Sequence, residues 1–168
     1  MGEVLTLAAV DPERLVALLR RFGLVLNRVD AGAEIPGSYW GEPEAGIIGM
    51  HLYARADTPL HSLLHEACHV ICAPPEKRAA LHTDASSCQL EEDAACYLQI
   101  LLGDELPDVG RDRLMADMDL WGYSFRLGST RAWFERDAED ARAWLLCRGL
   151  IDPLTHAATS LAADRRGH

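Results

Sequence analysis

The stretch that decides the fold is Leu-His-Ser-Leu-Leu-His-Glu-Ala-Cys-His-Val-Ile-Cys, residues 60–72. The four-residue spacing of His65 and His69 places their rings one turn apart on the same face of a helix, roughly 5–6 Å from each other. Two imidazoles placed in this way can bind one metal ion, and the carboxylate of Glu66 can then take a proton from water at that ion. Because the flanking residues are mostly apolar, the sequence predicts a buried helix with these three side chains as its polar centre.

The five residues from His65 to His69 match the HExxH pattern of zinc hydrolases. A catalytic zinc site also needs a third protein ligand and an open position for water. Cys72 and Pro75 stand where the metzincin type has a glycine and its third histidine, so that type is excluded. The third ligand is therefore expected to be an acid on a second helix.

Residues 89–98, Gln-Leu-Glu-Glu-Asp-Ala-Ala-Cys-Tyr-Leu, supply the candidate acids. Glu91 lies one turn before Ala94 and Ala95, which define the predicted inward face of this helix. Glu92 falls nearer the edge of that face. We therefore expect Glu91 to be the third ligand, with Glu92 as the alternative.

The combination resembles the gluzincins, and among them the small ImmA/IrrE-like metallopeptidases, through Glu91-x-x-Ala94-x-x-Tyr97-Leu98 placed 91 − 69 = 22 residues after the motif. The resemblance covers roughly residues 46–102. It implies a zincin-like α+β domain with an edge strand beside the cleft, and zinc held by His65, His69 and Glu91. It also implies hydrolysis of a peptide or amide bond with Glu66 as general base. The two prolines after the motif depart from the family pattern, and the C-terminal half matches no member of it.

A second, weaker resemblance is to the elongation factor P hydroxylases, and it is carried by the segment from His69 through Cys72 to Lys77-Arg78. It implies iron-dependent oxygenation of a protein lysine side chain. Two histidines and one carboxylate suit Fe(II) as well as Zn(II), so the ligands leave the choice of metal open. A third alternative is a non-catalytic binding module whose structural metal is closed off by a fourth ligand, with His61, Cys72 or His82 as the candidates.

Other side chains near the motif have a functional and a structural interpretation. His61, one turn before His65, can support a ligand or line the cleft, or it can be an ordinary partly buried histidine. His82 and Asp84 can orient a ligand or stabilise an oxyanion, or they can form a turn and a helix cap. Tyr39 and Trp40, in the long loop over residues 30–46, can line a cleft or hold the loop against the core.

Length, charge and cysteine content exclude several classes of protein. The chain has 168 residues, 49% of them hydrophobic, which favours a single domain over residues 1–152 with a frayed tail over residues 153–168. The net charge of −10 argues against nucleic-acid and anionic-membrane binding. The sequence contains no membrane span and no signal-peptide core, and its five cysteines favour reduced thiols. We therefore expect a cytoplasmic protein whose partner is a peptide or protein substrate.

The remaining pattern predicts an α+β fold with a short sheet, an HExxH helix, a second metal-ligand helix and further C-terminal helices. Capping residues, prolines and glycines mark the element ends. Strands are expected over residues 24–29 and 46–55, and helices over residues 12–22, 60–72, 76–81, 86–103, 111–121 and 130–149.

Overall fold

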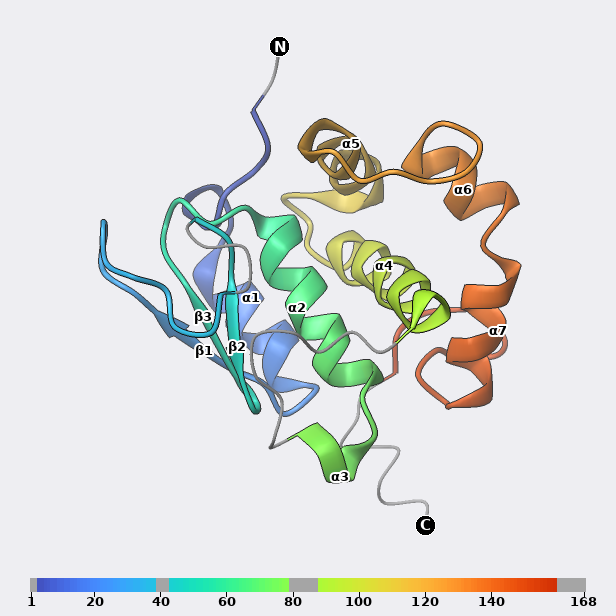
Figure 1. Ribbon diagram of the computed structural model, residues 1–168, viewed down its shortest axis with the longest axis horizontal. Helices are drawn as coiled ribbons and strands as arrows, with labels where there is room; N and C mark the ends of the chain where they lie inside the picture. Colours follow the sequence, from blue (N-terminus) through green and yellow to red (C-terminus); the bar gives the residue numbers. More distant parts are fainter. Residues whose placement is uncertain (1–2, 39–42, 79–87, 160–168) are drawn as a thin grey trace.

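The computed structural model of the chain describes residues 3–38, 43–78 and 88–159. The fold is mixed α+β, with a small sheet on one side of α2 and the C-terminal helices on the other (Figure 1). The elements are η1 (Leu7–Ala9), α1 (Pro12–Arg20), β1 (Val25–Arg28), β2 (Gly46–Ile48), β3 (His51–Ala54), α2 (Leu60–Cys72), α3 (Pro75–Arg78), α4 (Gln89–Asp104), α5 (Gly110–Trp121), α6 (Thr130–Arg136) and α7 (Glu139–Cys147).

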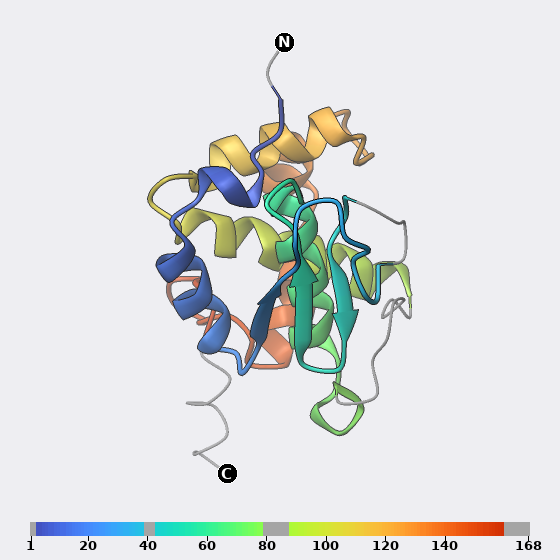
Figure 2. The ribbon, with the colours of Figure 1, turned by 90° about the vertical axis from the view of Figure 1, so that its left-hand side faces the viewer.

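The sheet has three strands in the order β1-β3-β2, and α2 packs behind it (Figure 2). β1 runs parallel to β3, whereas β2 and β3 are antiparallel neighbours. The single strand predicted over residues 46–55 is therefore wrong, because the chain reverses between Ile48 and His51. Gly49 has a φ of 62°, in the left-handed region that glycine adopts without steric cost, and this makes the tight turn possible.

Helix α2 lies at the centre of the molecule, and the predicted helix over residues 60–72 is confirmed at both ends. All of its side chains are buried except those of His65 and Glu66, which are half-buried. The polar centre of the helix therefore reaches solvent through these two residues, while the rest of the helix is packed on all sides.

The C-terminal end of α2 is stabilised by a buried arginine. The prolines at positions 74 and 75 end the helix, which leaves its last carbonyl groups without partners inside it. The guanidinium group of Arg78 donates hydrogen bonds to the carbonyl oxygens of Val70 and Ile71, each at 2.8 Å. The short helix α3 thus places the charged side chain of Arg78 at the C-terminal, negative end of the α2 dipole.

Helix α4 lies beside α2 and is also covered by α5 and α7 (Figure 1). Every residue from Ala94 to Gly103 is buried as a result. Apolar residues therefore surround this part of the helix instead of marking one inward face.

The C-terminal region differs from the prediction in two places. The single helix expected over residues 130–149 is two helices, because Asp137 leaves the helical conformation with a φ of −137° between α6 and α7. In the predicted tail, residues 153–159 fold back through a bridge between Ile151 and Ala158. Residues 160–168 lie outside the described part of the chain.

Two further observations concern the whole described chain. Within residues 3–38, 43–78 and 88–159, no helix combines the length and the apolar character that crossing a membrane requires. All five cysteines are free, and those at positions 68, 72 and 96 are buried.

Candidate metal centre

Three side chains from α2 and α4 converge on one point. Glu92 contacts His65 Nε2 through Oε1 at 2.8 Å and His69 Nε2 through Oε2 at 3.0 Å. The two Nε2 atoms are 3.0 Å apart. Among the described histidines, cysteines and acids, these three residues form the one group of ligand atoms that could hold a metal ion. The predicted ligands His65 and His69 are thus brought together, and their acidic partner is the alternative, Glu92.

Glu91, the preferred acid from the sequence, does not join this group. The helical phase read from Ala94, Ala95 and Leu98 is wrong by one residue, because α4 is buried all round and its apolar residues do not define a single face. Glu91 instead lies where its charge acts on the Cys72 thiol at the C-terminal end of α2. A carboxylate rotated by about 100° around the helix cannot reach the histidines.

The side of α4 that faces α2 is marked by the row Glu92, Cys96 and Gln99. These residues are four and three positions apart, so they share one helical face. Cys96 Sγ lies 4.0 Å from Nδ1 of His65, and Gln99 Oε1 lies 2.9 Å from the same nitrogen. The sequence reasoning missed Gln99, although a glutamine inside the apolar run of residues 94–102, seven positions after Glu92, was a signal that could have identified it.

Gln99 determines which nitrogen of His65 carries its proton. The Gln99 amide nitrogen donates to the carbonyl oxygen of His61 at 2.9 Å, and that oxygen can only accept. The Gln99 side-chain oxygen must then face His65 and accept from Nδ1–H. In the neutral ring this leaves the lone pair on Nε2, which is the nitrogen that faces His69 and Glu92.

His61 and Tyr123 complete the hydrogen-bond network behind the cluster. The Tyr123 oxygen accepts from the Gln99 amide at 3.4 Å, so its own proton is directed to His61 Nδ1 at 3.1 Å. Burial, followed by the nearby charge of His65, lowers the pKa of His61 to about 4, which keeps the ring neutral and able to accept this bond. His61 therefore supports the site from behind and does not point into the cluster.

The spacing of the three ligand atoms fits a metal ion. Bonds of 2.0–2.2 Å arranged tetrahedrally would separate neighbouring ligand atoms by about 3.3–3.6 Å. The two Nε2 atoms are 3.0 Å apart, and each lies 2.8–3.0 Å from one of the two Glu92 oxygens. An expansion of about 0.3–0.8 Å, which side-chain rotations can provide, would make room for the ion. The donor set of two imidazoles and one carboxylate suits zinc and Fe(II) alike.

The electrostatics around Glu92 also favour a cation between the three groups. Burial opposes ionisation of Glu92, but hydrogen bonds from His65 and His69 outweigh it and lower the pKa of the carboxyl group below its ordinary value. Glu92 is therefore a carboxylate at neutral pH. In the metal-free chain the pKa of His65 is raised, against the effect of burial, by Tyr123, Cys96 and Glu92, so its Nε2 carries a proton toward Glu92 that a bound metal would displace. The Glu92 side chain is 33% exposed, whereas those of His65 and His69 are 14% and 4% exposed. The cluster is therefore open to solvent on the side of Glu92.

Glu66, the predicted general base, lies beside the cluster without belonging to it. It makes no hydrogen bond to the part of the chain that the structure describes, and its side chain is half-buried. Burial above all raises the pKa of Glu66, and the charges of Glu92 and Glu44 raise it further against the opposing effect of His65 and His69. A carboxylate with a raised pKa and no fixed partner is suited to accepting and returning a proton.

Among the other candidates named from the sequence, those in the described part of the chain do not add a ligand. Cys72 does not belong to the group of ligand atoms, and burial, followed by the charge of Glu91, raises the pKa of its thiol to about 12 in the metal-free chain. His82 and Asp84 lie outside the described residues, as do Tyr39 and Trp40.

Comparisons of the chain with protein-family models, with curated proteins and with solved structures found no match. The function is therefore inferred from the side chains of the site and their geometry.

Proposed function

We propose that the chain is a metal-dependent hydrolase that cleaves a peptide or amide bond, with zinc held by His65, His69 and Glu92. One observation carries this proposal. Three ligand atoms lie within 4.8 Å of one another, and the half-buried carboxylate of Glu66, next to His65 on α2, is near enough for the charges of His65, His69 and Glu92 to act on its pKa. This arrangement suits a catalytic zinc site of three protein ligands, which leaves the fourth position for water or substrate.

The bound zinc would supply two effects, a lower pKa for water at the metal, of about 7, and polarisation of the substrate carbonyl. The chain supplies the remaining functions. Glu66 takes the proton from the attacking water and passes it to the leaving amine. Gln99 holds the His65 ring with its Nε2 lone pair directed at the cluster, so the ligand does not have to reorient before it binds.

The arrangement of α2 behind a small sheet supports the zincin-like interpretation of the fold. The sheet has β2 at its edge, and α2 contacts both β2 and β3. A peptide or protein is accordingly the proposed substrate. We propose gluzincin-type chemistry with one change from the sequence pattern, since the acid is Glu92 and lies one position later than expected.

Two alternatives make different use of the same residues. The donor set of two histidines and one carboxylate is also that of Fe(II) oxygenases, so a protein hydroxylase is the second candidate. A structural metal site would need a fourth ligand. Among the described residues no further histidine, cysteine or acid joins the three, and this favours an open, reactive site.

The decisive test compares wild type with Glu66→Gln and with Glu91→Gln, a matched control that makes the same chemical change outside the cluster. Each protein is loaded with zinc or with Fe(II) and incubated with a peptide library, and the products are read by mass spectrometry. We expect zinc-dependent cleavage by wild type and the control. Glu66→Gln should bind zinc equally well but cleave about 10²–10⁴-fold more slowly.

Two outcomes would contradict the hydrolase. Equal cleavage by Glu66→Gln would show that Glu66 is not the base. Gain of an oxygen atom by the peptides in the Fe(II) samples, with no cleavage in the zinc samples, would assign the site to an oxygenase.

A further inference from the structure

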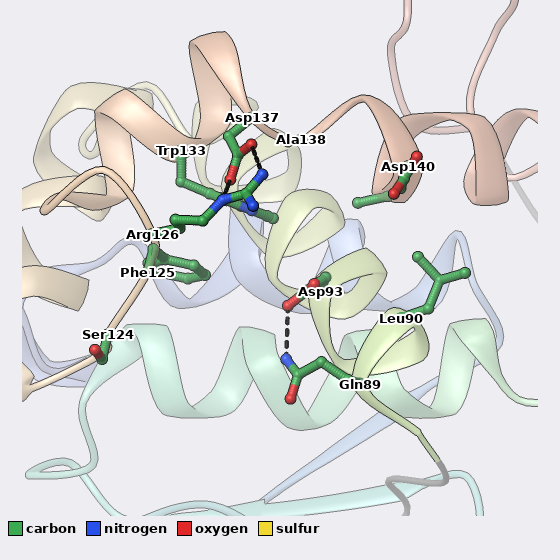
Figure 3. A pocket seen from close by; sticks show the side chains of 11 residues that line it. Gln89, Leu90, Asp93, Ser124, Phe125, Arg126, Trp133, Asp137, Ala138 and Asp140 are labelled. Atoms are coloured by element: carbon green, nitrogen blue, oxygen red, sulfur yellow. Dashed lines mark hydrogen bonds and ion pairs between the residues drawn. The ribbon is translucent and has the colours of Figure 1, made fainter.

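A pocket of about 470 Å³ lies between the first turns of α4, the loop that joins α5 to α6, and the start of α7 (Figure 3). Its walls carry three carboxylates, those of Asp93, Asp137 and Asp140, against the single cation of Arg126. Its floor includes the aromatic side chains of Phe125 and Trp133. The pocket thus combines an aromatic base with an excess of negative charge.

The pocket adjoins the candidate metal centre on two sides. Asp93 follows Glu92 on α4, so one pocket wall is the next residue around the helix from the acidic ligand. The Tyr123 ring, whose centroid is 5.9 Å from that of His65, stacks at 6.4 Å against the pocket residue Phe125. Phe125 in turn stacks on Trp133 at 4.5 Å. A row of aromatic rings therefore leads from the metal ligands to the floor of the pocket.

The chain already holds one guanidinium group at the rim of this pocket. Arg126 Nε donates to Asp137 Oδ2 at 2.9 Å, and Nη2 donates to the other carboxylate oxygen (Figure 3). The Arg126 side chain is 79% exposed, whereas that of Asp137 is 17% exposed. The cation therefore sits on the solvent side of the pair and can swing away, while the carboxylate is fixed in the pocket wall.

We propose that this pocket binds an arginine side chain of the polypeptide substrate, next to the bond that is cleaved. A planar guanidinium group can lie against the aromatic floor and can pair with two carboxylates at once, which an ammonium group does less well. After Arg126 has paired with Asp137, the charges of Asp93 and Asp140 remain for it, although one Asp93 oxygen also accepts a hydrogen bond from the neutral Gln89 amide at 2.9 Å (Figure 3). This inference rests on the proposed function for the position of the scissile bond, but the binding itself can be measured without catalysis.

The pairing of Arg126 with Asp137 has a testable consequence. Arg126 competes with an incoming guanidinium group for the Asp137 carboxylate and repels it by charge. Arg126→Ala should therefore increase affinity for an arginine peptide. A gain of affinity cannot result from partial unfolding, so this variant separates the proposal from a loss of structure.

The experiment measures peptide binding by calorimetry to zinc-loaded protein that carries Glu66→Gln, so that no cleavage occurs. The probes are two short acetylated peptides that differ only in arginine or citrulline, which has nearly the same shape without the charge. We expect the arginine peptide to bind at least about tenfold more tightly at low salt. Arg126→Ala should raise this preference, and Asp93→Asn with Asp140→Asn should remove most of it.

A control double variant, Glu13→Gln with Glu34→Gln, makes the same change in net charge at exposed positions away from the pocket. It should keep the preference for arginine.

Equal affinity of wild type for the two peptides would overturn the proposal, as would an equal loss of the arginine preference in the control double variant. If arginine peptides bind selectively but wild type cleaves none of them, the pocket stands and the proposed hydrolase fails. If wild type cleaves peptides without regard to arginine, the pocket assignment fails and the hydrolase stands.

Discussion

The side-chain oxygen of Gln99 accepts a hydrogen bond from Nδ1 of His65 at 2.9 Å, across the interface between α4 and α2. The other end of the same amide is bound to the His61 carbonyl oxygen and to the Tyr123 hydroxyl group. Gln99 is fully buried, and all of its hydrogen-bonding atoms are used. This residue therefore connects His65, the candidate metal ligand on α2, to the loop after α5 and fixes the direction in which the His65 ring points.

Gln99→Leu should weaken zinc binding by about 10–100-fold, because His65 loses the partner that selects its tautomer and orientation. The protein should also lose about 1–3 kcal/mol of unfolding free energy, since the Nδ1–H of His65 becomes unsatisfied in the interior and the His61 carbonyl loses its second donor. Competition with a chelator measures the affinity, and urea unfolding of the metal-free protein measures the stability.

The matched control for Gln99→Leu is Gln89→Leu at the exposed start of the same helix. Gln89→Leu makes the same substitution away from His65, so this variant should bind zinc like wild type. Unchanged zinc affinity in Gln99→Leu would show that the hydrogen bond to His65 is not needed to prepare the ligand.

His61 should make the stability of the metal-free protein depend on pH. Its pKa is lowered from 6.5 to about 4 in the folded chain, chiefly by burial. The unfolded chain therefore binds a proton at a higher pH than the folded chain, and stability contributed by neutral His61 is lost as the pH falls from about 6.5 to about 4. The loss from this group is expected to be a few kcal/mol.

The measurement for His61 is urea unfolding of metal-free wild type and His61→Phe at a series of pH values. Other histidines titrate in both proteins, so the difference between the two curves isolates His61. The variant should lose less stability than wild type over this interval. Parallel curves would mean that His61 is not held neutral by burial.

Arg78 should stabilise the motif helix through its hydrogen bonds to the carbonyl groups of Val70 and Ile71. Arg78→Met keeps much of the side-chain volume but removes both donors, so it should cost about 1–3 kcal/mol of unfolding free energy. The neighbouring exposed Lys77 provides the control, and Lys77→Met should change stability by no more than about 0.5 kcal/mol. If urea unfolding shows equal effects of the two substitutions, Arg78 does not stabilise the helix through these hydrogen bonds.

The position and length of α2 could be predicted from the sequence because the residues that determine them lie in or next to the helix. Pro59 and the prolines at positions 74 and 75 mark its ends, and the apolar run between them has the length of a buried helix. The pair His65 and His69 follows from helical spacing alone. The hairpin of β2 and β3 was missed because Gly49 stands inside an otherwise continuous strand-like run, where its positive φ leaves no trace in hydrophobicity.

The acid that faces His65 and His69 could not be chosen from the apolar pattern because α4 has neighbours on several sides. Glu92, Cys96 and Gln99 mark the face of α4 that points toward α2. Polar residues inside an otherwise apolar helix would therefore have identified Glu92 from the sequence. The contact of Tyr123 with His61 spans 62 positions in the chain. Nothing local in the sequence predicts such a contact, since it depends on how α5 packs over α2.

The central claim is that Glu92, together with His65 and His69, holds the metal. It is tested most directly by zinc titration against a competing chelator in wild type, Glu92→Ala and its neighbour control Glu91→Ala. We predict about one zinc per wild-type chain, affinity lowered by more than about 100-fold in Glu92→Ala, and a change within about threefold in Glu91→Ala. Equal zinc affinity in all three proteins, or a large loss in Glu91→Ala alone, would contradict the account.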